Sequence, residues 1–241
     1  MTRTWIGVKS RGAYSSIGPV PINHMSYNMQ KKKYVLVSLT LCGLVGAAGV
    51  ALTQPPTGPM SFFVTSRGSG NGGNLGGLAG ADAICQNLAN GVGQGDLTWR
   101  AYLSTQGTNA VNARDRIGPG PWFNAKGARI AANVDELHSM AHRMSAFTAI
   151  DERGNSIPGS GFSPNRHDIM TGSRADGTAY PAGADMTCSN WTSNGDNGKA
   201  RVGHHDYAAW NSTHDSAGCS QAALVSTGGD GLFYCFALPR N

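Results

Sequence analysis

Leu-Phe-Tyr-Cys-Phe, at residues 232–236, combines aromatic and aliphatic side chains in a run typical of a buried β-strand. Residues 224–227, Leu-Val-Ser-Thr, have a similar strand-forming character. Between the two runs, residues 228–231 read Gly-Gly-Asp-Gly, a composition that favours a tight turn. The pattern therefore predicts a β-hairpin at the end of the folded part of the chain.

The segments upstream of this hairpin predict an α+β fold. Residues 61–66 and 99–104 are rich in aromatic and apolar residues and are interpreted as strands. Between them, the apolar residues of 78–90 recur every three or four positions, which predicts a helix. From residue 107 to residue 213, turn-forming residues recur every few positions, so we expect a long irregular loop region.

The basic charge of the sequence is confined to its N-terminal segment. The 241 residues carry a formal net charge of +5, with a pI near 9.1. Residues 1–51 contain six Lys and Arg residues and no Asp or Glu, whereas the remainder contains 13 basic and 14 acidic residues. A domain with a net charge of −1 and no run of Lys or Arg offers no support for nucleic-acid binding.

The same N-terminal segment has the pattern of an export signal. Lys31, Lys32 and Lys33 precede an uncharged stretch that reaches residue 52. Residues 29–52 are therefore interpreted as a signal peptide or, because about 20 apolar residues span a bilayer, as an uncleaved N-terminal anchor. We expect the protein to be secreted, periplasmic or at the cell surface, with membrane contact only through an uncleaved leader.

The remaining boundaries follow from this leader. Residues 1–28 are interpreted as an unstructured extension or as the product of a wrongly assigned start codon. Residues 53–60, which include Gln-Pro-Pro-Thr-Gly-Pro, are predicted to form a linker. Residues 61–241 are predicted to form one folded domain.

The cysteine count favours disulfides in that domain. Once Cys42 in the leader is set aside, four cysteines remain: Cys85, Cys188, Cys219 and Cys235. An even number of cysteines in an exported domain is typical of a disulfide framework, and four cysteines allow three pairings. The absence of any Cys-x-x-Cys pair argues against a zinc finger.

The order of these segments resembles the C-type lectin-like fold, and within it the endostatin-like subclass. The run Trp-Arg-Ala-Tyr-Leu-Ser at 99–104 is similar to an endostatin strand. The glycines and serine of 171–177, followed by Cys-Ser-Asn-Trp at 188–191, are similar to its Gly-Ser…Gly…Cys-x-x-Trp run. Bacterial secreted lectin-like proteins have comparable Arg-His-Asp-Ile and Gly-Leu-Phe-Tyr-Cys-Phe runs. The resemblance covers residues 62–238.

This resemblance implies the fold and the disulfide pairing. A C-type lectin-like domain has a long irregular loop region and two nested disulfides, one from the first helix to the last strand and one within the loops. The implied pairs are Cys85–Cys235 and Cys188–Cys219. The resemblance also implies ligand binding, although the same fold hosts many functions.

The sequence departs from the calcium-binding pattern of sugar-binding C-type lectins. The corresponding triplets here, Ser163-Pro164-Asn165 and Trp210-Asn211-Ser212, lack the family's carboxylates. Calcium prefers six to eight oxygen ligands, so the usual site is incomplete. Calcium remains a possible cofactor only if nearby aspartates replace the missing ligands, and the cofactor is otherwise unassigned.

Polar residues between positions 163 and 215 are the candidates for ligand binding. Histidine and aspartate are adjacent in His167-Asp168, His205-Asp206 and His214-Asp215. They are interpreted either as a metal or sugar site, or as side chains that hydrogen-bond irregular backbone. Because neighbouring side chains on a strand point to opposite faces, at most one of His204 and His205 should join a site near Asp206. The predicted ligand-binding residues are Asn165, Asp168, Asp196, His205, Asp206, Trp210, Asn211 and Asp215.

Three further features of the sequence bear on a binding site: the tryptophans, the turn at 194–198, and the pair His138 and His142. Trp210, beside polar Asn211, is the aromatic candidate to stack on a sugar ring, whereas Trp99 and Trp191 are expected in the core. Residues 194–198 offer oxygen ligands without the spacing of an EF-hand, and are interpreted as an exposed turn. His138 and His142 are expected to share a helix face. Without a third ligand they indicate a surface helix rather than a zinc site.

The sequence therefore predicts an exported ligand-binding module without catalytic residues. Its expected function is carbohydrate recognition, with a glycan or a cell-surface protein as the partner. The first alternative is a structural or adhesive module that binds protein. The second is a metal-dependent hydrolase, which requires His167, one of His204 and His205, and His214 to converge within about 4 Å of a common point.

Overall fold

A computed structural model of the chain describes residues 57–240. The predicted leader, the extension before it and residues 53–56 of the predicted linker lie outside the described residues. The strands are β1 (Phe62–Val64), β2 (Trp99–Ala101), β3 (Trp122–Phe123), β4 (Arg129–Ala131), β5 (Asp168–Met170), β6 (Arg201–His204), β7 (His214–Asp215) and β8 (Gly229–Ala237). The helices are α1 (Gly77–Asn90), α2 (Val134–Leu137), α3 (Cys188–Trp191) and α4 (Gln221–Ser226), with a 3-10 turn η1 (Ala113–Asp115).

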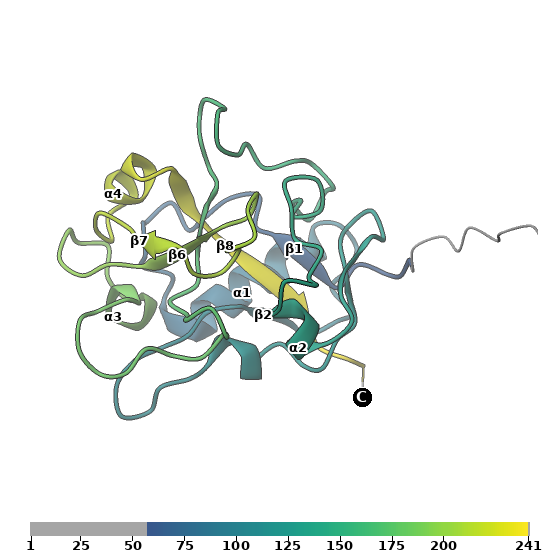
Figure 1. Ribbon diagram of the computed structural model, residues 1–241, viewed down its shortest axis with the longest axis horizontal. Coiled ribbons are helices and arrows are strands. Elements are labelled where there is room, and N and C mark those ends of the chain that lie inside the picture. Colours follow the sequence, from purple (N-terminus) through teal and green to yellow (C-terminus); the bar gives the residue numbers. More distant parts are fainter. Residues whose placement is uncertain (1–56, 241) are drawn as a thin grey trace, which may run out of the picture. The chain divides into compact units, whose positions relative to one another are not determined.

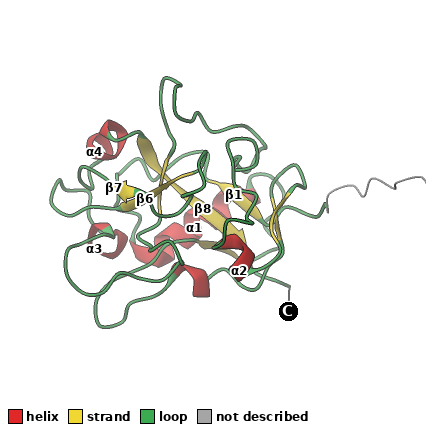
Figure 2. Cartoon of the chain, viewed as in Figure 1, coloured by secondary structure: helices red, strands yellow, loops and turns green. Residues whose placement is uncertain are grey.

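The described part is a mixed α/β fold in which long loops connect short elements (Figures 1 and 2). Its larger sheet has the order β1-β8-β5-β6-β7, and β2 also pairs with β8. β3 and β4 form a separate two-stranded sheet. Strand β8 is the longest, and it pairs antiparallel with β1 and β2 and parallel with β5.

Strand β8 divides the hydrophobic core into two clusters. Its residues 233, 235 and 237 pack with α1, Trp99 and Trp191, whereas residues 232, 234 and 236 pack with Trp122 and Trp210. Residues on a strand point alternately to opposite faces, so one fully buried strand contributes to both clusters. The prediction that Trp99 and Trp191 are core residues is confirmed, because their exposed fractions are 1% and 0%.

Helix α1 agrees closely with the predicted 78–90. Ala81, Cys85, Leu88 and Ala89 form its buried face, and the backbone N–H of Gly91 donates to carbonyls of the last turn. One polar residue, Asp82, also lies on the buried side. Its carboxylate accepts hydrogen bonds from Arg100, Arg116 and the Ala101 backbone, so this buried charge is fully paired.

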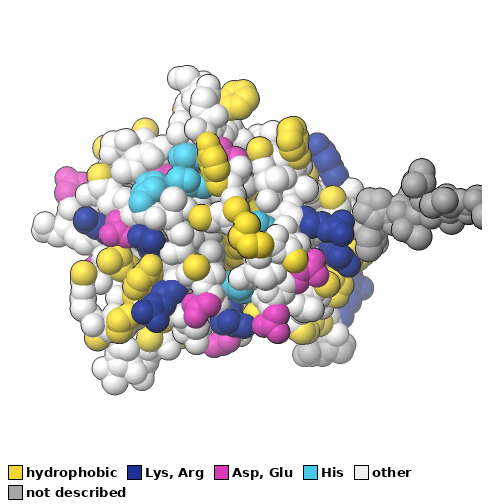
Figure 3. All heavy atoms as spheres, viewed as in Figure 1, with side chains coloured by type: hydrophobic (Ala, Val, Ile, Leu, Met, Phe, Trp, Pro, Cys, Tyr) yellow, Lys and Arg dark blue, Asp and Glu magenta, His cyan; other side chains and the backbone are white. Residues whose placement is uncertain are grey.

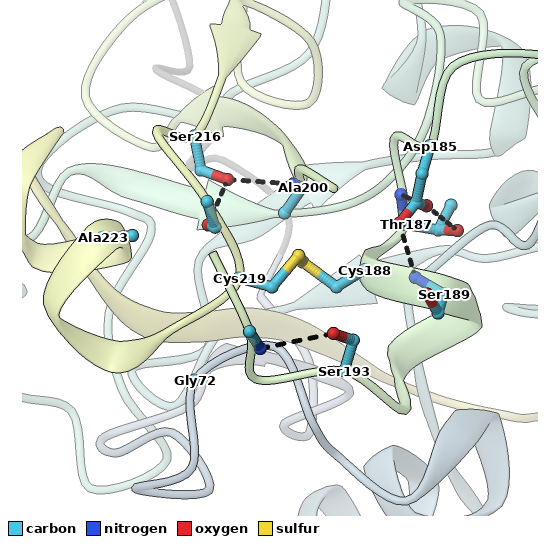
Figure 4. Close-up of a disulfide and its surroundings, with 12 residues drawn as sticks. Gly72, Asp185, Thr187, Cys188, Ser189, Ser193, Ala200, Ser216, Cys219 and Ala223 are labelled. Carbon is cyan, nitrogen blue, oxygen red and sulfur yellow. Dashed lines mark hydrogen bonds between the residues drawn. A yellow bond between two sulfur atoms is a disulfide. The ribbon is translucent and has the colours of Figure 1, made fainter. Parts of the chain in front are cut away.

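Both disulfides are those implied by the resemblance. Cys85–Cys235 joins α1 to β8 across 150 residues, and Cys188–Cys219 closes 31 residues of the loop region (Figure 4). In the chain-entropy model, loops of these lengths contribute at most about 5 and 4 kcal/mol to the free energy of unfolding. All four residues of α3 have positive φ, between 48° and 68°, so the chain makes a left-handed turn beside the inner disulfide.

Two sequence-based predictions differ from the structure. The predicted C-terminal hairpin is wrong, because its first strand lies largely within helix α4. The Ser220 side chain caps this helix by accepting from Ala223 N–H, and Leu224 is its only buried residue. The predicted linker also ends earlier, since Thr57 pairs with Ala128 and Met60 is 8% exposed. No helix among residues 57–240 is long and apolar enough to cross a membrane.

Candidate functional site

The register of three neighbouring strands brings histidines and a carboxylate together. Asp168 on β5 lies directly opposite His204 on β6. His214 on β7 is paired with Val202, which lies two residues before His204 and therefore on the same face of β6. His167, which immediately precedes β5, completes what we call the His/Asp cluster: His167, Asp168, His204 and His214. Histidine side chains gather on the corresponding face of the molecule, coloured cyan in Figure 3.

The cluster converges on one carboxylate oxygen. The Nε2 atoms of His167, His204 and His214 lie 3.2, 3.1 and 3.3 Å from Asp168 Oδ1. Ligand atoms of His167, Asp168 and His204 all lie within 4.8 Å of one another, a spacing suited to a metal ion. His214 approaches from the outer edge, where its side chain is 38% exposed.

The carboxylate at the centre of the cluster is buried without well-aligned hydrogen bonds. The Asp168 side chain is 1% exposed, against 12% for His167 and 16% for His204. Among residues 57–240, no well-aligned hydrogen bond reaches either oxygen of Asp168 or His204 Nε2, although Thr227 and His214 lie close enough to lower the pKa of Asp168 through hydrogen bonding. The atoms of the cluster are therefore close together, but their angles do not suit hydrogen bonds. Each buried polar atom without a partner costs about 1–3 kcal/mol of folding free energy.

A second carboxylate lies behind His167. Asp206 Oδ1 is 3.3 Å from His167 Nδ1, the ring nitrogen that faces away from Asp168. The other oxygen of Asp206 accepts a hydrogen bond from Ser160 N–H at 2.8 Å. Asp206 thus links the loop before β5 to the first imidazole of the cluster.

Burial sets the protonation of the cluster. Burial, as the largest cause, and the nearby His167 and His214 lower the pKa of His204 to about 4. Burial also raises the pKa of Asp168, an effect that the same two histidines partly oppose. At neutral pH the His204 imidazole is therefore uncharged and has a free electron pair for a metal ion.

Close backbone contacts hold the loops around the cluster. A Cβ atom at Gly203 would lie 2.0 Å from the Trp210 carbonyl oxygen, so the loop after β6 folds back directly onto this strand. A Cβ atom at Gly228, where φ is +101°, would lie 2.7 Å from Asn165 Nδ2. The Asn165 side chain accepts from His167 N–H at 3.1 Å and so fixes the backbone from which His167 extends.

Two of the predicted ligand-binding residues, Asp168 and Asp206, lie at the site itself. Asn165 supports the site through the His167 backbone, and Asp215 lies beside it in an ion pair with Arg201 at 3.0 Å. His205, which follows the last residue of β6, is fully buried. Asp196 is exposed in the turn at 194–198, where the Gly195 carbonyl accepts from Cys219 N–H, and is not part of the cluster.

Trp210 and Asn211 belong to the interior. Trp210 is 2% exposed and its indole N–H donates to the Leu137 carbonyl, so it is a core residue rather than a stacking platform. Asn211 is 3% exposed and donates to the Tyr102 hydroxyl and to two carbonyls. Trp210 was expected to be exposed because its neighbour Asn211 is polar. Burying the large apolar surface of the Trp210 side chain is more favourable and determines its position.

Three histidines and one tyrosine of the site were absent from the predicted ligand-binding set. His167 and His214 were expected only as members of the His-Asp pairs of a metal or sugar site, and all three histidines as ligands of the alternative hydrolase. Tyr207, 54% exposed, packs edge-on against His204 and His167, with ring centroids 5.8 and 6.3 Å apart. The repeated pairing of histidine with aspartate was the available signal for the histidines, and nothing in the sequence distinguished Tyr207.

The donor set determines what the cluster can do. Three imidazole nitrogens and a carboxylate are ligands that first-row transition metals accept, whereas calcium requires more oxygen atoms. No known family model matches the sequence, and a comparison with curated proteins finds no relative. The chemistry of this site is therefore the basis for assigning a function.

Proposed function

We propose that this chain is an exported ligand-binding module that recognises carbohydrate at the cell envelope or outside the cell. The surface around the His/Asp cluster and Tyr207 is the proposed ligand site. The observation that carries this proposal is the exposed ring of Tyr207, which packs against His204 and His167 beside a buried group of unpaired polar atoms. The two disulfides support an oxidising compartment.

We also propose that the domain has the C-type lectin-like fold, in its endostatin-like form. The disulfide between α1 and β8, the second disulfide within the loops, and the long irregular region between them support this assignment. The fold alone does not define a ligand, so the functional proposal depends on the site.

The side chains at the surface of the cluster suit a sugar. Imidazole and carboxylate edges exchange hydrogen bonds with hydroxyl groups, and the exposed face of Tyr207 can pack against the apolar face of a sugar ring. Tyr207 takes the role that was expected of Trp210. The neighbouring loop contributes Phe162, which is 69% exposed and belongs to the segment anchored to Asp206 through Ser160.

A glycan array with the full chain tests this function. We expect one class of glycan to bind, and Tyr207→Ala to weaken that binding by about 10-fold or more, since aromatic stacking is worth up to ~1.5 kcal/mol beyond the buried area. Phe147→Ala removes another exposed aromatic side chain, 87% exposed, and should bind as the wild type does. A silent array, or equal losses in both variants, contradicts the proposal.

The structural or adhesive alternative uses the same surface and predicts a different result. A protein partner would be retained in a pull-down that contains EDTA and free sugars. Carbohydrate recognition predicts that free sugar releases the bound partner. The two functions are therefore separated by competition alone.

A metal-dependent hydrolase is the second candidate, and the convergence it requires is present. The Nε2 atoms of the three histidines lie within 3.3 Å of Asp168 Oδ1. A metal held by these groups could activate a water molecule. Zinc-dependent turnover of chromogenic esters, phosphoesters or glycosides that is lost in Asp168→Asn would establish this function over binding alone.

A further inference from the structure

The His/Asp cluster has polar atoms that the described residues leave unsatisfied. Both oxygens of Asp168, His204 Nε2, His167 Nδ1 and Asp206 Oδ1 are buried without hydrogen-bond partners in residues 57–240. Folded proteins rarely bury several such atoms in one place without an unrecorded partner. The Asp168 oxygens and His204 Nε2 are electron-pair donors, so the partner that they lack is a cation, whereas His167 Nδ1 and Asp206 Oδ1 face each other at 3.3 Å behind the cluster.

Three members of the cluster, His167, Asp168 and His204, have ligand atoms that all lie within 4.8 Å of one another, whereas His214 reaches Asp168 but lies outside this group. A tetrahedral ion with metal–ligand bonds of about 2.0–2.1 Å has ligands about 3.3–3.4 Å apart. The separations of Asp168 Oδ1 from the three Nε2 atoms are 3.1, 3.2 and 3.3 Å. The strand register determines these distances between ligand atoms. Gly203 and Gly228 contribute because, without a Cβ atom, they let the loops approach β6 and His167 closely.

We propose that His167, Asp168 and His204 bind one divalent first-row transition-metal ion, of which zinc is the representative, and that His214 approaches the ion from the exposed edge of the cluster. The ion compensates the buried charge of Asp168. Since His214 is the most exposed of the four side chains, the ion lies nearest the surface on that side, and Tyr207 packs against the other two histidines, His204 and His167. This metal site goes beyond the proposed function, because it holds whether or not the ligand is a carbohydrate.

Asp206 is a positioning residue for this site. Metal-binding histidines commonly donate their second ring N–H to a carboxylate, which fixes the tautomer and the direction of the ring. Asp206 Oδ1 lies 3.3 Å from His167 Nδ1, and Ser160 N–H holds its other oxygen. His167 is thereby held with Nε2 toward the ion.

Calcium does not fit the same ligands. It prefers oxygen at 2.3–2.6 Å with six to eight ligands, whereas this cluster offers three nitrogens and one carboxylate.

The two arginines nearest to the cluster in the sequence, Arg166 and Arg201, are already paired with Asp230 and Asp215. Neither is available to neutralise Asp168 in place of an ion.

Zinc binding to the full chain tests the site. After removal of metal with a chelator, titration calorimetry and elemental analysis should give one zinc ion per chain and no competition by calcium. Outer partners of a metal typically change its affinity by about 10- to 100-fold, so Asp206→Asn should weaken zinc binding within this range. His204→Ala should exceed that loss, and cobalt in the wild type should give the intense visible bands of a tetrahedral ion.

The controls separate a lost ligand from a lost fold. His142→Ala removes a histidine outside the cluster, whose ring contacts the Ala208 carbonyl, and should bind zinc as the wild type does. His214→Gln changes the exposed histidine of the cluster and should lose affinity while its melting temperature in chelator stays that of the wild type. Zinc binding that His204→Ala and His214→Gln leave unchanged, or the absence of zinc binding by the wild type, overturns the proposal. Failure on the glycan array with zinc bound would contradict the carbohydrate function alone.

Discussion

The core around β8 and the His/Asp cluster are stabilised in opposite ways. Both faces of β8 pack aromatic and aliphatic side chains, and the buried charge in that region, Asp82, has two arginine partners. On β5, β6 and β7 the buried carboxylate Asp168 faces three histidines and accepts no hydrogen bond from the described residues. One region is complete by itself, whereas the other lacks a partner for its buried polar atoms.

This difference shows where the chain gives up stability for function. Removing apolar surface from water stabilises the core without any ligand. Burial of unpaired polar atoms in the cluster is unfavourable, and it persists because the surrounding strands and loops fix the positions of the side chains. Variants and conditions that act on only one region can test this division.

The largest expected effect concerns the two disulfides. The double variant Cys85→Ala/Cys235→Ala opens a loop of 150 residues that ties α1 to β8, and should lower the free energy of unfolding by about 5 kcal/mol. Cys188→Ala/Cys219→Ala opens 31 residues and should cost about 4 kcal/mol. Urea denaturation measures both values. A larger loss from the inner pair would mean that the loop region, rather than the core, limits stability.

Acid should destabilise the cluster more than the apolar core. His204 has a folded pKa of about 4 and an ordinary value of 6.5, so between these pH values only the unfolded chain takes up its proton. Stability is therefore fully present above pH 6.5 and falls until about pH 4, by an amount on the order of 3 kcal/mol. Burial lowers the pKa values of His138 and His205 as well, which adds to the same trend, whereas the raised pKa of Asp168 opposes it because the folded chain takes up that proton first.

Unfolding of the metal-free chain between pH 7 and pH 4 measures this dependence. His204→Gln should flatten part of the curve, because the residue no longer titrates. His142→Gln, which removes a histidine outside the cluster, should leave the curve unchanged. A wild-type curve that is flat over this interval would show that the cluster does not resist protonation.

Zinc should stabilise the cluster and leave the variant without Asp168 unaffected. A ligand present at 100 times its dissociation constant raises the free energy of unfolding by about 2.7 kcal/mol, and we expect this gain in the wild type. Asp168→Asn should lose the zinc-dependent gain. In chelator, the variant should be at least as stable as the wild type, because it no longer buries a charge whose pKa is raised by burial. Thermal unfolding with and without zinc measures both effects.

The sequence was sufficient to predict the part of the fold that depends on apolar patterns. Helix α1 follows from local periodicity, and the strands that contain residues 62–64, 99–101 and 232–236 follow from their aromatic and apolar residues. The disulfide pairing was implied by the resemblance to the C-type lectin-like fold, because the cysteines alone allowed three pairings. Local pattern failed at residues 224–227, where β-branched residues suggested a strand. The cap at Ser220 and the burial of Leu224 instead favour a helix.

The site was harder to predict because strand register creates it. The adjacent pairs His167-Asp168 and His214-Asp215 are visible in the sequence, but their meeting with His204 depends on pairing across β5, β6 and β7. His204 is the last residue of β6, and His205 follows the strand as a fully buried residue. The sequence did not reveal which of the two faces the carboxylate, and no local pattern showed that Trp210 is buried while Tyr207 is exposed.

The smallest expected effect concerns the backbone that shapes the site. Gly203→Ala would place a Cβ atom 2.0 Å from the Trp210 carbonyl oxygen, so the loop after β6 must move. Overpacking of this kind typically costs about 1–3 kcal/mol, and the shift should also weaken zinc binding because His204 is the next residue. Gly195→Ala is the matched control, since its nearest neighbour would be 3.7 Å away in an exposed turn. If both variants keep wild-type stability and zinc affinity, the close approach at Gly203 does not hold the cluster in place.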